Sequence, residues 1–179
     1  MIKRPVKRHS VTQPIDTLYR YIPLTHNQNA IVDVGDFEWL SQFNWRAVWN
    51  SHTCSFYAAR NVNTKNVYMH RVILGSAPKE ETDHWNHNTL DNRRENLRKC
   101  TGTQNLSNRG MQRNNKSGFK GVYWEKDRGK WGAMIQAKGK VICLGRFQTP
   151  EEAARAYDAA AREQFGEFAF LNFPLSVTS

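Results

Sequence analysis

The sequence has few cysteines. Cys54, Cys100 and Cys143 are the only three among 179 residues, and no two of them form a C-x-x-C pair. A disulfide framework or a structural zinc knuckle requires more closely spaced cysteines, so the sequence indicates neither. We expect all three thiols to be reduced, ordinary residues.

Long hydrophobic runs are also missing. No apolar stretch approaches the length of a membrane-spanning helix. The N-terminal letters MIKRPVKRHS have no apolar core of the kind that a secretion signal carries. We therefore expect a cytoplasmic protein without a membrane partner, built as one or two small domains.

The sequence does contain one cluster suited to chemistry. Asp83 and His84 are adjacent, and Asn96 and Asn105 follow Asp83 by 13 and 22 positions. Carboxylate and amide oxygens are ligands that Mg²⁺ prefers, and an imidazole can take a proton from water near neutral pH. Each residue alone is better explained by a turn or a helix cap, and only the spacing favours a site. A strand ending at His84 and a helix over 103–109 could meet if a two-stranded ribbon packs on that helix.

The segment TDHWNHNTLDNRRENLRKCTGTQNLSN resembles the HNH nucleases, and among them the homing endonucleases of phages and introns. The letters MHRVILG, at 69–75, also resemble the segment that precedes the motif in those enzymes. The resemblance implies a ββα-metal fold with one divalent cation, Mg²⁺ or Mn²⁺, and no small-molecule cofactor. It implies that His84 is the general base, that Asp83 and Asn105 hold the metal, and that Asn96 braces the loop.

The reaction implied by this resemblance is metal-assisted hydrolysis of a phosphodiester bond, with His84 taking a proton from water. With one site per chain, a monomer would nick one strand, and cutting both strands would need a second copy on the DNA. Two other histidines are weaker candidates. His87 is better explained as a solvated turn residue, and His70 by packing or a phosphate contact.

Acidic residues are scarce beside basic ones. The chain has 16 Asp and Glu against 26 Lys and Arg, which gives a net charge of +10. Scattered lysines are usually solvated surface, so the placement of the charges matters more than their number. Cations that cluster near the candidate site would bind phosphates and release counterions, which favours nucleic acid over an anionic membrane. The residues assigned to DNA here are Arg93, Arg94, Arg98, Arg109 and Arg113, with Lys99 beside them.

The N-terminal third is expected to complete the nuclease core. Asp36 is the predicted N-cap of a short helix over 37–43, because its side-chain oxygen could accept amide hydrogens of the first turn. Alternating patterns predict strands at 22–25, 29–34, 45–49 and 56–60. We expect five aromatic residues to be core rather than a base-stacking platform: Phe37, Trp39, Phe43, Trp45 and Trp49.

Hydrophobic periodicity disappears over 109–118, which predicts a linker. Beyond it, apolar and polar residues alternate and predict three antiparallel strands, at 119–124, 130–136 and 141–147. Thr149, Pro150 and Glu152 then form a capping box at the start of a helix. Small residues recur at helical spacing after it, so the helix can lie close against the sheet.

The letters KGVYW, GKWGAMI, LGRFQTPEEAARAYDAAA and LNFP occur in this order and resemble the DNA-binding domain of plant APETALA and ethylene-response-factor proteins. The resemblance implies a three-stranded sheet in the major groove of double-stranded DNA. The plant arginine of the first strand is Tyr123 here, and the arginine and tryptophan of the third are Val141 and Cys143, so plant target sequences do not transfer. Trp131 could equally pack or contact DNA. The predicted contacts are Lys120, Tyr123, Trp124, Lys126, Arg128, Lys130, Gln136, Lys138 and Arg146.

The sequence as a whole predicts an α+β protein. A nuclease domain would span 1–108, with its ββα-metal core at about 80–108, and a DNA-binding domain would span 119–175 after the linker. The predicted function is a DNA endonuclease of homing type, from a phage or mobile element, in the cytoplasm of an infected or bacterial host cell. Two alternatives stay open: a DNA-binding transcriptional regulator with an inactive HNH domain, and a structure-directed nuclease of repair or restriction.

Overall fold

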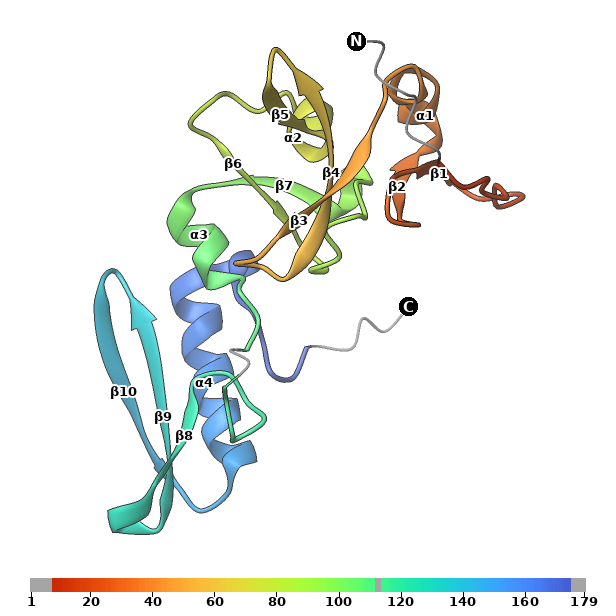
Figure 1. The fold of residues 1–179 in the computed structure, drawn as a ribbon. Coiled ribbons are helices and arrows are strands. Elements are labelled where there is room, and N and C mark those ends of the chain that lie inside the picture. The colour runs from red at the N-terminus through yellow and green to blue at the C-terminus, as the bar shows by residue number, and fades with distance from the viewer. Residues whose placement is uncertain (1–7, 112–113, 175–179) are drawn as a thin grey trace. The chain divides into compact units, whose positions relative to one another are not determined.

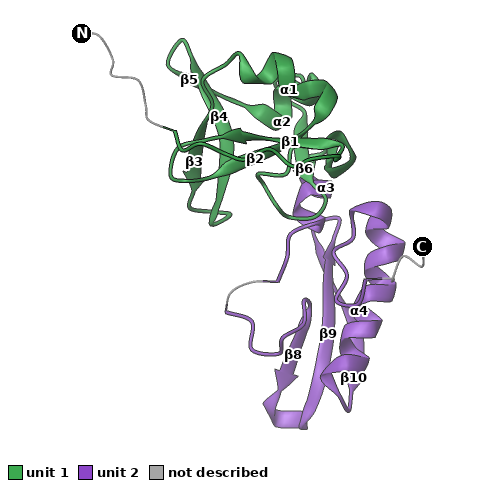
Figure 2. Ribbon diagram, turned by 90° about the vertical axis from the view of Figure 1, so that its right-hand side faces the viewer, with its two compact units in different colours: residues 1–101 green, residues 102–179 purple. Residues whose placement is uncertain are grey.

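The computed structural model describes residues 8–111 and 114–174. The chain divides into two compact units, residues 1–101 and residues 102–179 (Figure 2). Each unit contains antiparallel strands and at least one helix, so the protein is a mixed α and β structure. Arg113, predicted to contact DNA, lies outside the described residues.

The first unit begins with an antiparallel ribbon of β1 (Tyr19–Pro23) and β2 (Asn29–Asp33), followed directly by α1 (Val34–Ser41). A three-stranded antiparallel sheet comes next, with the strand order β3-β4-β5. Its strands are β3 (Arg46–Asn50), β4 (Ser55–Val62) and β5 (Lys65–Tyr68). The short helix α2 (Met69–Leu74) leads to a second ribbon, β6 (Glu81–His84) paired with β7 (Leu97–Cys100), and η1 (Arg94–Asn96) precedes β7 (Figure 1).

The core of this unit joins its separate sheets and helices. Leu24, Val32, Leu40 and Met69 are fully buried, and Trp45 donates from its indole to the Leu40 carbonyl at 2.8 Å. The predicted aromatic core is confirmed for four residues, which are buried or packed against this cluster: Phe37, Trp39, Phe43 and Trp45.

Two predictions for this part are wrong. Trp49 is 53% exposed, because it lies near the end of β3 beside the hairpin turn, where its ring meets that of Phe56. Asp36 does not cap a helix, because α1 begins two residues earlier, directly after β2. Asp36 is instead buried, where it accepts from the Trp39 indole and pairs with Arg94.

The second unit begins with the short helix α3 (Gly102–Ser107) and contains an antiparallel sheet with the strand order β10-β9-β8. Its strands are β8 (Val122–Glu125), β9 (Lys130–Ala137) and β10 (Lys140–Phe147), with η2 (Lys126–Arg128) between the first two. The helix α4 (Pro150–Phe165) covers one face of this sheet, and η3 (Gly166–Phe168) follows it. The capping box is confirmed, since Thr149 Oγ1 accepts from Glu152 N and the Glu152 carboxylate accepts from Thr149 N.

Small residues let α4 lie close to the sheet. Ala153, Ala154 and Ala161 are fully buried against it. Gly121 has a φ of +76°, and a Cβ there would stand 2.1 Å from Tyr157 Cδ2, so only glycine fits. The buried Asp158 carboxylate accepts from the backbone N–H groups of Asn172 and Phe173, which attaches the closing LNFP segment to the helix.

Among the residues that the structure describes, no helix is both long and apolar enough to cross a bilayer.

Candidate active site and nucleic-acid interface

The strand β6 ends with the two residues singled out by the sequence. Asp83 and His84 are both buried, at 7% and 5% exposure. The register of the ribbon places Asp83 opposite Arg98 and His84 opposite Leu97. Arg98 donates from Nε and Nη2 to Asp83 Oδ2, at 2.9 and 2.7 Å, and its side chain is largely buried too. Asp83 is therefore one half of a charged, mostly desolvated ion pair.

Aromatic rings surround His84. The ring of His70 meets it edge to face at a centroid distance of 5.0 Å, and the ring of Tyr57 does so at 6.0 Å. His70 is itself buried and stacks on Tyr68. His70 thus has the packing role that was one of the two expected for it, although local sequence patterns did not indicate His84 as its neighbour.

Burial sets the protonation of both histidines. Desolvation lowers the pKa of His84 to about 4, although Asn92 and the nearby carboxylates Asp83 and Asp91 act in the opposite direction. Desolvation lowers the pKa of His70 to about 3, with help from the charges of His84 and Arg71. Both imidazoles are therefore neutral at pH 7, and a neutral imidazole is the form that can accept a proton.

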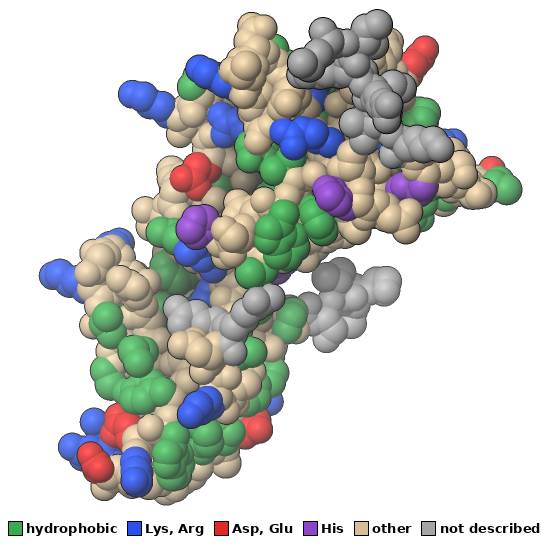
Figure 3. Space-filling model, viewed as in Figure 1, with side chains coloured by type: hydrophobic (Ala, Val, Ile, Leu, Met, Phe, Trp, Pro, Cys, Tyr) green, Lys and Arg blue, Asp and Glu red, His purple; other side chains and the backbone are tan. Residues whose placement is uncertain are grey.

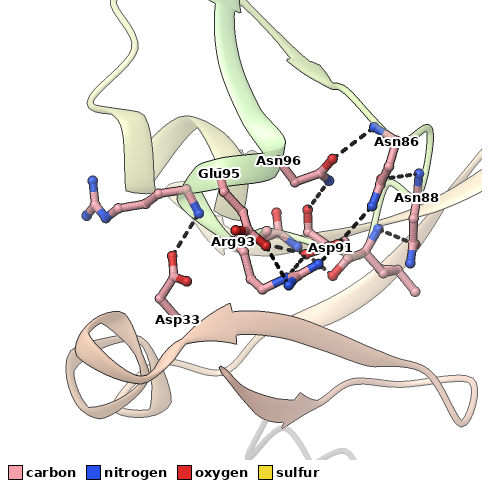
Figure 4. A network of polar contacts seen from close by, with 10 residues as sticks. Asp33, Asn86, Asn88, Asp91, Arg93, Glu95 and Asn96 are labelled. Atoms are coloured by element: carbon pink, nitrogen blue, oxygen red, sulfur yellow. Dashed lines mark hydrogen bonds and ion pairs between the residues drawn. The ribbon is translucent and has the colours of Figure 1, made fainter. Parts of the chain in front are cut away.

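Asn96 ties together the loop between β6 and β7 (Figure 4). Its side-chain oxygen accepts from the Asn86 N–H at 2.9 Å, and its Nδ2 donates to the Asp91 carbonyl at 2.7 Å. Its own carbonyl accepts from the Trp85 N–H at 2.9 Å. These bonds hold the residues directly after His84. The positioning role assigned to Asn96 stays a prediction.

The arginines of this region bind carboxylates. Arg93 pairs with Asp91 and Glu95, while Arg94 holds Asp36 with two hydrogen bonds of 2.8 Å. With Arg98 on Asp83, three of the residues assigned to DNA phosphates have acidic partners inside the first unit. Arg109 is exposed and belongs to the second unit. The phosphate contacts of all four remain predictions.

The oxygen donors around Asp83 suit a hard cation, but a cation would compete with Arg98 for the Asp83 carboxylate. Asp83 offers carboxylate oxygen, yet a guanidinium already lies on Oδ2. Within the described residues, no group of three His, Cys, Asp and Glu side chains could hold a metal ion by itself. The second predicted ligand, Asn105, lies on α3 in the second unit, so the Asp83 and Asn105 pair remains a prediction.

In the second unit, the register assigns side chains to the two faces of the sheet. Tyr123, Glu125, Gln136 and Arg146 share the face opposite α4, since paired residues project to the same side. Glu125 lies at the centre of a small network: it accepts from the Tyr123 hydroxyl at 3.2 Å and from Arg146 Nε at 2.7 Å, and it pairs with Arg128. Glu125 therefore binds three of the predicted DNA contacts, which was not anticipated from the sequence.

Other predicted DNA contacts of this unit occupy different places. Lys120 Nζ donates to the carbonyls of Ser107 and Arg109, and burial lowers its pKa to about 8. Trp124 lies on the α4 side of the sheet, half exposed, at 5.0 Å from the Trp131 ring. Trp131 packs against the core, which is one of the two roles that the sequence left open. The remaining predicted contacts, all exposed, are Lys126, Arg128, Lys130 and Lys138.

Comparison with known proteins identifies the second unit. Residues 117–167 match the family model of the AP2 domain. Dehydration-responsive element-binding protein 2A of Arabidopsis thaliana is 41% identical over 76 residues, which are 41% of this chain and 22% of that protein. An ethylene-responsive transcription factor of the same plant is 48% identical over 63 residues, or 34% of each chain. The chain thus spans about a third or less of the length of these plant relatives.

A relative of a different kind extends over most of the chain. An uncharacterized HNH endonuclease of Acanthamoeba polyphaga mimivirus is 27% identical over 161 residues, which are 88% of this chain and 83% of that protein. An alignment of this length includes residues of both units. Since the family match and the plant relatives agree with the observed sheet and helix, the second unit carries an AP2-like domain.

Proposed function

We propose that this protein is a DNA endonuclease in which an HNH-type site cuts double-stranded DNA bound by the AP2-like domain. The observation that carries the proposal is the β6–β7 ribbon, where Asp83 and His84 are consecutive buried residues at the end of β6 and Asn96 fixes the loop after them. The viral relative supports it, because its name is that of an HNH endonuclease and its alignment covers both units.

In the proposed reaction, neutral His84 takes a proton from the water whose oxygen attacks phosphorus. The bond between phosphorus and the 3′ oxygen breaks, and that oxygen takes a proton from solvent. Asp83 and Asn105 would hold one divalent cation, Mg²⁺ or Mn²⁺, which supplies positive charge to the phosphate. Asn96 positions His84 through the loop backbone and does not touch the substrate.

Tethering to a DNA-binding domain gives such a site its target. Contacts to phosphate carry no sequence information, whereas a sheet in the major groove reads base edges. A linked reader also raises the effective concentration of the nuclease at the chosen site. This division suits a homing-type enzyme of a phage or mobile element, acting as a nicking monomer in the cytoplasm of an infected or bacterial cell.

The alternative is a DNA-binding regulator whose HNH-type region has no activity. Two observations favour it: the plant relatives include a protein named as a transcription factor, and the Asp83 carboxylate is held by Arg98. A nuclease must share that carboxylate with a cation, whereas a pure DNA-binding protein can keep the ion pair permanently.

Incubation of the purified protein with supercoiled plasmid and Mg²⁺ distinguishes a nuclease from a regulator. If the protein is a nuclease, the plasmid is converted to open circle, and both EDTA and His84→Ala abolish the conversion. The His84→Ala variant should still shift DNA in a mobility assay. His87→Ala is the matched control, since it changes a histidine in the same loop that is exposed, and it should nick normally. A mobility shift without any cleavage by the wild type would establish the regulator instead.

A further inference from the structure

An apolar strip runs along the open face of the β8–β10 sheet. Val141 is 66% exposed, Met134 is 38% exposed, and Cys143 is exposed as well. The register pairs Val141 with Gln136 and Cys143 with Met134. Because paired residues of antiparallel strands project to one side, these four side chains form a continuous patch on the face opposite α4.

Positive charge borders the strip at both ends. Lys138 and Lys140 lie at the turn between β9 and β10, and η2 with the start of β9 supplies Lys126, Arg128 and Lys130 at the other end. Figure 3 shows hydrophobic side chains over β9 and β10 and Lys and Arg side chains toward both ends of the sheet. At the η2 end, acidic side chains lie among them, and Asp127 of η2 is exposed. A surface with an apolar middle and a cationic rim matches a DNA groove, where bases lie between two rows of phosphates.

The polar groups nearest the strip are already engaged. Arg146 donates to Glu125 at 2.7 Å, and the Tyr123 hydroxyl donates to the same carboxylate at 3.2 Å. An arginine held in this way is less able to form the bidentate contact that distinguishes guanine. Gln136 is exposed. Its side-chain amide can both donate and accept a hydrogen bond.

We propose that this strip selects A·T base pairs by packing Val141, Met134 and Cys143 against thymine methyl groups, with Gln136 reading an adjacent adenine. In the major groove, thymine alone presents a C5-methyl group, and adenine presents the N7 and N6 pair that a glutamine amide matches. The proposal rests on DNA binding by the AP2-like domain and specifies what that domain reads. Removing one contacted methyl group should weaken binding about fourfold, from the transfer free energy of a single buried carbon.

The test uses the full chain in EDTA, so that binding is measured without cleavage. A random duplex pool is enriched for binding, and the selected duplex is compared with a copy in which deoxyuridine replaces each thymidine in turn. Deoxyuridine keeps base pairing and removes only the methyl group. We expect thymine in the selected site and about fourfold weaker binding for each contacted methyl that is lost.

A substitution in the strip tests whether the strip causes the weaker binding to deoxyuridine duplexes. Val141→Thr keeps the branched shape of the side chain and replaces a methyl by a hydroxyl, so it should reduce the difference between the thymidine and deoxyuridine duplexes. Val62→Thr makes the same change at an exposed strand residue of the first unit and should leave the difference intact. Equal melting temperatures of both variants would exclude unfolding as the cause.

The outcomes separate this inference from the proposed function. Tight binding to a selected site that contains no thymine, or equal binding to the thymidine and deoxyuridine duplexes, would overturn the strip proposal and leave DNA binding in place. Failure to bind any duplex would overturn DNA binding by this protein, and the strip proposal with it.

Discussion

The buried pair of Asp83 and Arg98 offers the most direct test of the first unit. Arg98→Met keeps much of the side-chain volume but removes the guanidinium and both of its hydrogen bonds to Asp83 Oδ2. The two side chains are only 8% and 15% exposed, so water cannot easily replace the lost partner. Removing one member of a buried pair typically costs about 3–5 kcal/mol, because the other charge stays buried and uncompensated.

A loss of that size is comparable with the whole stability of a small domain, about 5–15 kcal/mol. The free energy of unfolding is measured by urea titration of the full chain. The double variant Asp83→Asn with Arg98→Met should recover most of the loss, because it leaves no buried charge behind. Lys99→Met is the matched control: it breaks an exposed pair with Glu80 and should leave the unfolding midpoint unchanged. A loss below about 1 kcal/mol for Arg98→Met would refute the reasoning that the Asp83 charge depends on this partner.

Two further changes test other parts of the structure by urea unfolding. Gly121→Ala should destabilise the second unit by about 3 kcal/mol or more and weaken DNA binding, because the new Cβ would clash with Tyr157 at a positive φ. Gly129→Ala is its control, since nothing lies within 4 Å there, and equal losses for the two would argue against the clash. Asn96→Ala should cost about 2–4 kcal/mol, because it leaves two backbone groups of the loop without partners. The exposed Asn88→Ala should cost clearly less, and a small loss for Asn96→Ala would show that the loop does not depend on these bonds.

Elements specified by neighbouring residues could be predicted from the sequence. The three strands of the second unit follow from alternation, and the start of α4 follows from Thr149 with Glu152 three positions later. The pairing of β6 with β7 was also expected, because the turn residues between them separate two short runs. Boundaries were less accurate: β8 begins at Val122, since Ser117 and Asn115 hold the residues before it in a turn.

Contacts between distant residues could not be predicted in this way. Arg94 and Asp36 are 58 positions apart, and no local pattern relates them. The same limit applies to His70, whose contact with His84 depends on how α2 packs against β4 and β7. From residue type and local pattern alone, Asp36 was therefore assigned to a helix cap, Arg94 to phosphate, and His70 to packing or a phosphate contact.

The face of the sheet on which a side chain lies is hard to predict from sequence for a different physical reason. A strand alternates its side chains with a period of two, so an error of one residue moves every side chain to the opposite face. Trp124 was predicted to contact DNA together with Tyr123, yet adjacent residues of one strand cannot share a face. Only the register with β9 and the position of α4 show that Tyr123 lies on the open side.

The ion pair on Asp83 is the point at which the two functional alternatives separate. If the protein is a nuclease, a cation must approach a carboxylate whose Oδ2 already carries a guanidinium, and the repulsion between the two positive charges must be relieved. DNA supplies the means, because a phosphate is itself a bidentate partner for arginine. Arg98 could then exchange one anion for another while the cation binds, and the site would be complete only on its substrate. If the protein is a regulator, no such exchange is needed, and the pair simply fastens β6 to β7.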